Sequence, residues 1–78
     1  MSETVAPQLH AYEIRVPGGR DVVSAIRWEL FVFHDVREVL ATDRPDVVIV
    51  IYRDQPQPSR WLETLRSAGY SVTADGGP

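Results

Sequence analysis

The 78-residue chain contains no cysteine, and its eight basic residues are all arginine, so lysine is also absent. Without cysteine there can be no disulfide, no thiolate metal ligand and no cysteine nucleophile. Without lysine there can be no Schiff-base chemistry and no lysine of a phosphate-binding loop. The arginines are scattered along the sequence, which does not fit the clustered basic patch of a nucleic-acid-binding domain.

The sequence also lacks a long hydrophobic run and a strong net charge. No stretch approaches the ~20 apolar residues of a membrane-spanning helix. Residues 1–4 lack the basic start of a signal peptide, so we expect a cytoplasmic protein with no membrane contact. The net charge of −3 argues against attraction to nucleic acid or to anionic lipid.

The length predicts one small domain with a thin core. A chain of this size buries only about 60% of the surface that its unfolded form exposes, which makes oligomerisation a reasonable expectation. A hydrophobic fraction of 44% with 24% charged residues is typical of a globular protein. We expect a single α/β domain over residues 9–75, a flexible tail at 1–8 and a frayed end at 76–78.

The most apolar stretch is Val47–Tyr52, six apolar residues in a row between Asp46 and Arg53. It is too short to span a membrane, and its β-branched residues favour a strand over a helix. Successive side chains of a strand point to opposite faces, so an unbroken apolar run indicates that both faces are covered. The pattern therefore predicts a central strand.

Other segments show clear periodicity. Leu9–Val16 alternates between apolar and polar residues, which predicts a half-buried strand. Asp21–Leu30 has apolar residues at helical spacing, with Asp21 as a candidate cap. A second helix should begin at Pro58 and end at Gly69, a residue suited to the left-handed conformation. Tyr70–Thr73 can form a last short strand.

The segment Phe31–Asp43 admits two interpretations. Asp35-Val36-Arg37-Glu38 has the form of a capping box, which would extend or restart the first helix. Alternatively, Val36–Thr42 forms a strand that a tight turn at Asp43-Arg44-Pro45-Asp46 joins to the central strand. The Asp and Pro residues of that turn favour the strand.

The resulting order of elements is strand, helix, strand, strand, helix, strand. It predicts an α+β fold, the ferredoxin-like βαββαβ two-layer sandwich, with the first and third strands as the inner pair. The alternative is a three-stranded α/β sandwich with a longer first helix. In the ferredoxin-like arrangement both helices cover one face of the sheet, so the apolar central strand implies that another molecule covers the other face.

The turn after the first strand is a candidate ligand site formed by Pro17, Gly18, Gly19 and Arg20. Backbone amides at a helix N-terminus bind anions, and arginine adds several donors. The element order and this Pro-Gly pair resemble ACT regulatory domains, a resemblance that implies amino-acid binding at the turn. The sequence departs from that pattern in having Val16 instead of an acidic residue, and in the inserted Gly19-Arg20-Asp21.

Several aromatic and apolar side chains exceed what so small a core can bury. Trp28 falls off the apolar stripe of the first helix, and exposed aromatic residues of this kind often mark an interface. The candidate interface combines them with alternate residues of the inner strands: Tyr12, Trp28, Phe31, Phe33, Val48, Val50 and Tyr52.

These features favour a non-enzymatic association module that forms a homodimer or docks on a partner protein through its open sheet face. A small-ligand sensor using the Pro17–Arg20 turn is a second hypothesis, and a small dimeric enzyme is a third. For the enzyme, Glu13, Glu29 and His34 are candidate bases, yet the sequence selects none of them. The sequence indicates no catalytic residue, metal site or cofactor, and nucleic-acid binding is not expected.

Overall fold

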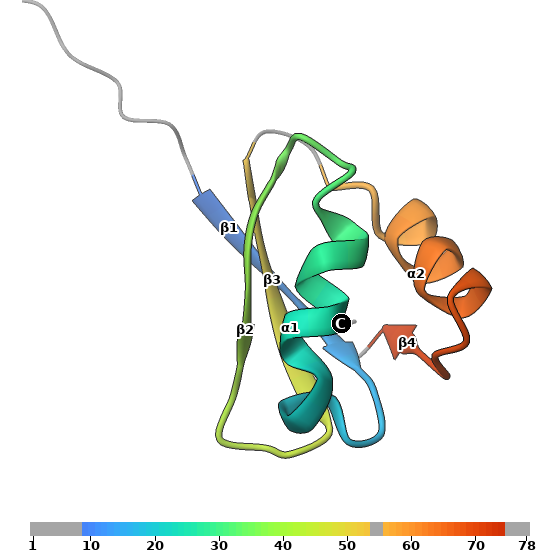
Figure 1. Ribbon diagram of the computed structural model, residues 1–78. Coiled ribbons are helices and arrows are strands. Elements are labelled where there is room, and N and C mark those ends of the chain that lie inside the picture. The colour runs from blue at the N-terminus through green and yellow to red at the C-terminus, as the bar shows by residue number, and fades with distance from the viewer. Residues whose placement is uncertain (1–8, 54–55, 75–78) are drawn as a thin grey trace, which may run out of the picture.

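Two helices and four strands make up the protein in a computed structural model that describes residues 9–53 and 56–74. The expected tail at 1–8 and the C-terminal residues 75–78 lie outside the described residues. In chain order the elements are β1 (Leu9–Arg15), α1 (Gly19–Leu30), β2 (Val36–Ala41), β3 (Val47–Arg53), α2 (Pro58–Ser67) and β4 (Thr73–Ala74) (Figure 1).

The strands form one antiparallel sheet in the order β2-β3-β1-β4. The chain is therefore a small α+β domain whose first and third strands are the inner pair, as expected. β1 and β3 pair along their whole length, from Leu9 opposite Arg53 to Arg15 opposite Val47. β4 is much shorter and pairs with β1 only at Ile14 and Arg15.

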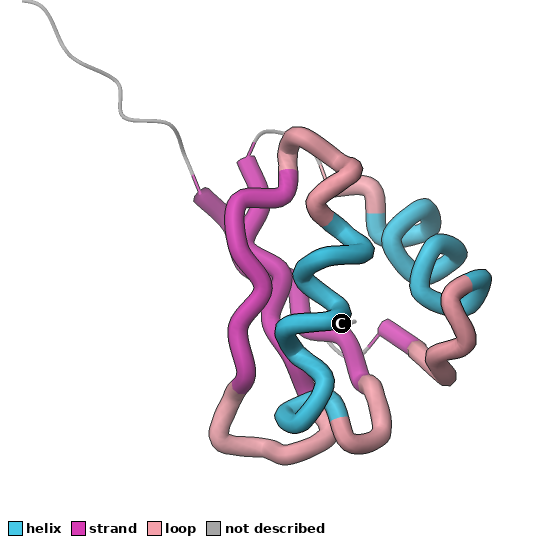
Figure 2. The backbone as a smooth tube through the Cα atoms, viewed as in Figure 1, coloured by secondary structure: helices cyan, strands magenta, loops and turns pink. Residues whose placement is uncertain are grey.

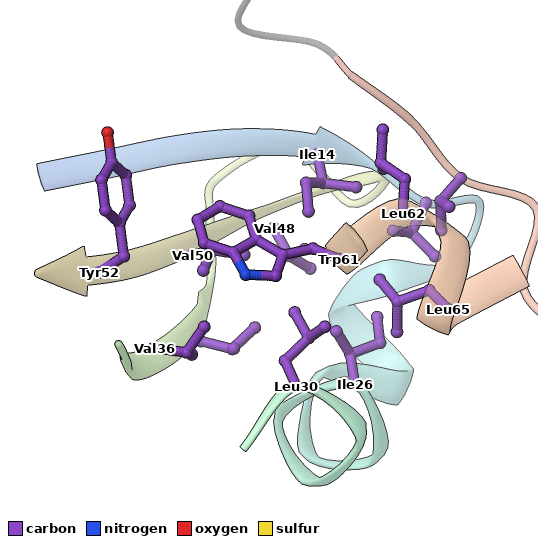
Figure 3. Close-up of a cluster of buried hydrophobic side chains, with 13 residues drawn as sticks. Ile14, Ile26, Leu30, Val36, Val48, Val50, Tyr52, Trp61, Leu62 and Leu65 are labelled. Carbon is purple, nitrogen blue, oxygen red and sulfur yellow. The ribbon is translucent and has the colours of Figure 1, made fainter. Parts of the chain in front are cut away.

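Both helices lie on the same side of the sheet, with α1 over β2 and β3 and α2 beside it toward β4 (Figures 1 and 2). Trp61 of α2 fills the space between the helices and the sheet, with its ring 5.3 Å from that of Tyr52 (Figure 3). On the other strand its ring lies 5.8 Å from that of Tyr12. The buried core cluster also contains Ile14, Val16, Ile26, Leu30, Val36, Val39, Val48, Val50, Leu62, Leu65 and Val72.

α1 begins two residues earlier than expected. Gly18 precedes it in the left-handed conformation, with φ of 71°, and no side chain caps this end of the helix. Asp21 is therefore not a cap, although as a carboxylate in the first turn it interacts favourably with the helix dipole. The backbone of Val22 departs from helical geometry (φ −118°, ψ 15°), so the regular turns follow it.

The ambiguous segment after α1 is a turn followed by a strand, as the Asp43–Asp46 turn indicated. The alternative with three strands and a longer first helix is wrong, because α1 ends at Leu30 and Val36–Ala41 pairs with β3. A bulge between Val36 and Glu38 changes the register of this pairing. Since a bulge adds one residue to one strand, Val36 and Val39 are both buried although they are three positions apart.

α2 has the expected signals at both ends. Pro58 stands in its first turn, and Gly69 is left-handed with φ of 102°. The N–H of Tyr70 donates to the carbonyl of Leu65 at 2.9 Å, and that of Gly69 to the carbonyl of Arg66 at 3.0 Å. This is the Schellman arrangement that ends many helices. The last strand was placed too early: β4 is Thr73–Ala74, and Tyr70 belongs to the helix ending.

The two tryptophans provide a matched test of the core. Trp61 is 1% exposed and Trp28 is 78% exposed. Replacing a buried tryptophan by alanine removes its apolar contacts and leaves a cavity, so Trp61→Ala should lower the free energy of unfolding by about 3–5 kcal/mol. Trp28→Ala should change it by less than about 0.5 kcal/mol. Urea denaturation followed by circular dichroism measures both, and equal losses would contradict this description of the core.

Candidate functional site

The sheet face turned away from the helices carries apolar residues that no described helix covers. It carries Val47, Ile49 and Ile51 of β3. These residues alternate along the strand with Val48, Val50 and Tyr52, which belong to the core. Ile49 lies between Leu40 of β2 and Glu13 of β1 in the strand register. We call this surface the open face.

The apolar part of the open face extends to both neighbours of β3. Ile51 lies opposite Ala11 of β1, and the next position along β1 on this side is Leu9. Leu9 and Leu40 are 57% and 44% exposed. Ile49 and Ile51 are half-buried, whereas Val47 is fully buried, so the accessible apolar part of β3 on this face is Ile49 and Ile51.

Three residues expected at the interface instead belong to the core. Val48, Val50 and Tyr52 are buried under the helices, so the prediction that they line the open face was wrong by one position along the strand. Tyr12 is half-buried on the same helix-facing side, with its ring 5.8 Å from that of Trp61. A shift of one residue moves every side chain of a strand to the opposite face.

Charged residues of both signs border the open face. Arg44 Nη2 lies 3.0 Å from Glu13 Oε1, which joins the β2–β3 loop to β1. Glu38 of β2 instead reaches the helix layer, where its Oε1 lies 2.7 Å from Arg27 Nε of α1. Interfaces commonly have such an arrangement, with apolar residues at the centre and a polar rim.

The glycine turn proposed as a ligand site packs against the β2–β3 loop, residues 42–46 (Figure 2). The N–H of Gly18 donates to Asp46 Oδ1 at 3.0 Å, and that of Gly19 donates to the carbonyl of Val16 at 2.8 Å. The N–H of Arg20 donates to the carbonyl of Pro45 at 3.0 Å. All three amides therefore have acceptors within the chain.

The side chain of Arg20 is used in the same way. Its Nη2 donates to the carbonyls of Thr42 and Asp43, at 3.1 and 2.9 Å. The turn lies so close to β3 that glycine is favoured at position 19, because a Cβ there would lie 3.0 Å from Cγ1 of Val48. Pro17, Gly18, Gly19 and Arg20 thus join two loops, and this use of their donors does not favour an anion site.

The aromatic residues at the end of α1 have different environments. Trp28 is exposed, Phe31 is 45% exposed and the neighbouring Val32 is 75% exposed; together the three line a shallow hollow. Phe33 is half-buried, packs against the core and has the Arg60 guanidinium 5.9 Å from its ring centre. We call Trp28, Phe31 and Val32 the α1 patch, which lies on the helix layer and not on the open face.

The candidate bases lie on three different elements. Glu13 is on β1, Glu29 is on α1, and His34 is exposed in the following turn, with Nε2 3.8 Å from Asp35 Oδ1. Among the described residues, no group of three or more His, Asp or Glu side chains is placed to hold a metal ion. The arrangement does not select a general base.

Comparisons with protein-family models, with curated proteins and with solved structures found no match for this chain. No helix in residues 9–53 and 56–74 is long and apolar enough to cross a membrane. The functional argument therefore rests on the surfaces described above.

The contact between the two loops depends on Asp46. Asp46→Ala removes the acceptor of the Gly18 N–H and should lower the free energy of unfolding by about 0.5–1.5 kcal/mol, the usual net contribution of a hydrogen bond, because this bond is exposed to solvent. Asp43→Ala is the matched control, because Asp43 contacts Arg20 through its carbonyl only. Urea denaturation compares them, and an equal effect of the two substitutions would show that the Gly18–Asp46 bond contributes no stability.

Proposed function

We propose that this protein is a non-enzymatic association module with the ferredoxin-like fold, and that it forms a homodimer through its open face. The fold assignment is supported by the inner position of β1 and β3 and by the split of each strand–helix–strand unit by a third strand. The function is supported by one observation above all: the central strand is apolar on both faces, and the described helices cover only one.

A second copy of the chain suits the open face for reasons of chemistry. The centre, with Ile49, Ile51 and Leu40, is apolar, as homodimer interfaces are. The rim carries charges of both signs in the Glu13–Arg44 pair. A two-fold axis through the face can therefore place acidic groups of one copy near basic groups of the other.

The size of the face predicts a weak dimer. Three strands at a spacing of ~4.8 Å and five residues of ~3.3 Å each give a patch of roughly 14 by 17 Å. That is roughly 240 Å², about a third of the ~800 Å² per partner that specific interfaces bury, so the patch can form only the centre of an interface and residues around it must contribute the rest. We expect a monomer–dimer equilibrium in the micromolar range instead of an obligate dimer.

The other two functions are less well supported by the geometry. A ligand sensor at Pro17–Arg20 would need donors that are already bonded to the β2–β3 loop. An enzyme is less well supported because the candidate bases Glu13, Glu29 and His34 lie on separate elements and do not converge on one pocket. The ligand sensor would require rearrangement of the described contacts between the two loops.

Sedimentation equilibrium tests the homodimer. At rising micromolar concentration the parent should approach twice the chain mass of 8.8 kDa. Leu40→Glu places a charge beside Ile49 in the apolar part of the proposed interface, where its burial would be costly, and should keep the protein monomeric. Leu40 is already partly exposed, so the fold should tolerate the change.

The matched control is Val32→Glu, which adds the same charge on the helix layer and should leave the equilibrium unchanged. A parent that stays monomeric at every concentration would exclude the homodimer. A parent whose dimerisation is unaffected by Leu40→Glu would place the interface elsewhere.

A further inference from the structure

The outer side of the helix layer contains a groove between α1 and α2 with two carboxylates. Glu29 of α1 and Glu63 of α2 line it, together with Thr64, Ser67 and Ala68, and its volume is about 600 Å³. The two helices pack against each other along this line. The groove therefore combines a negative charge from each helix with a polar floor.

Neither carboxylate is paired with a cation within residues 9–53 and 56–74. Arg60 and Arg66 lie one helical turn on either side of Glu63, but both are directed elsewhere. Arg60 packs over the ring of Phe33, and Arg66 Nη2 donates to the carbonyl of Val72 at 3.0 Å. The groove thus keeps its negative charge.

The α1 patch adjoins this groove. Trp28 and Glu29 are consecutive residues of α1, and Val32 lies in the turn just after the helix, which ends at Leu30. Trp28 and Val32 are three-quarters or more exposed, and no described element covers them. An exposed apolar surface and an acidic groove thus both lie at the C-terminal end of α1, within a few residues of each other in the chain, on the layer opposite the open face.

We propose that this helix-layer surface binds a basic amphipathic segment of a partner protein. Apolar side chains of the segment would pack on Trp28 and Val32, and its arginines or lysines would lie near Glu29 and Glu63. Aromatic anchors next to complementary charge are a common means of helix-in-groove recognition. The inference is separate from the homodimer, since the two surfaces are on opposite layers.

Peptide binding provides the test. The probe is a designed amphipathic peptide of about 16 residues, long enough to form a helix, with leucine on one face, arginine beside it and no tryptophan. Trp61 is already buried, so a blue shift of the protein's fluorescence on binding reports the burial of Trp28. The parent protein should bind this peptide more tightly than the same peptide with glutamate in place of arginine.

Reversing the charges of Glu29 and Glu63 tests whether the groove is the binding site. The double variant Glu29→Arg/Glu63→Arg should bind the arginine peptide about three- to tenfold more weakly and should prefer the glutamate peptide. Asp43→Arg makes the same kind of charge change in the β2–β3 loop, at the other end of α1 (Figure 1), and should retain the preference of the parent. Circular dichroism checks that each variant is folded.

Three results would overturn the proposal: no fluorescence change with either peptide, equal affinity for both peptides, or an unchanged preference in the double variant. A blue shift that grows with protein concentration alone would instead assign the α1 patch to self-association. The same titration on Leu40→Glu separates the two proposals, because docking on the helix layer should persist when the open face is disrupted.

Discussion

The structure depends on the two-sided packing of β3. This strand is hydrogen-bonded to a neighbour on each side, and apolar residues occupy both of its faces. Val48, Val50 and Tyr52 form the base on which Trp61, Ile26 and Leu30 pack. Burial of these side chains stabilises the domain, and the same alternation necessarily directs Ile49 and Ile51 away from the helices. The core and the proposed interface are thus the two sides of one strand.

Most elements could be predicted from the sequence, because their signals are local. The alternation in β1, the helical spacing in α1, and Pro58 and Gly69 at the ends of α2 each act within a few residues. Local sequence does not determine which side chains of β3 face the helices. Every residue of Val47–Tyr52 is apolar, so the sequence does not distinguish the face that meets the helices; only packing decides it.

Two other features could not be predicted because they depend on contacts between distant segments. The donors of Gly18 and Arg20 are used by residues 42–46, so the turn alone cannot show whether an anion could reach them. The acidic groove was missed because its carboxylates, Glu29 and Glu63, come from different helices. The capping-box form of residues 35–38 also allowed a helix there, whereas the chain forms strand β2 with a bulge.

That bulge also affects how copies of the chain can meet. β2 is an outer strand of the sheet, and such edges can pair with strands of other molecules and lead to aggregation. Here the extra residue interrupts the regular ladder, and Arg37 and Glu38 put charged side chains beside it. A protein with exposed apolar surfaces on both layers thus has one edge that resists open-ended strand addition. Self-association at the sheet face can therefore form closed pairs without fibrous growth from β2.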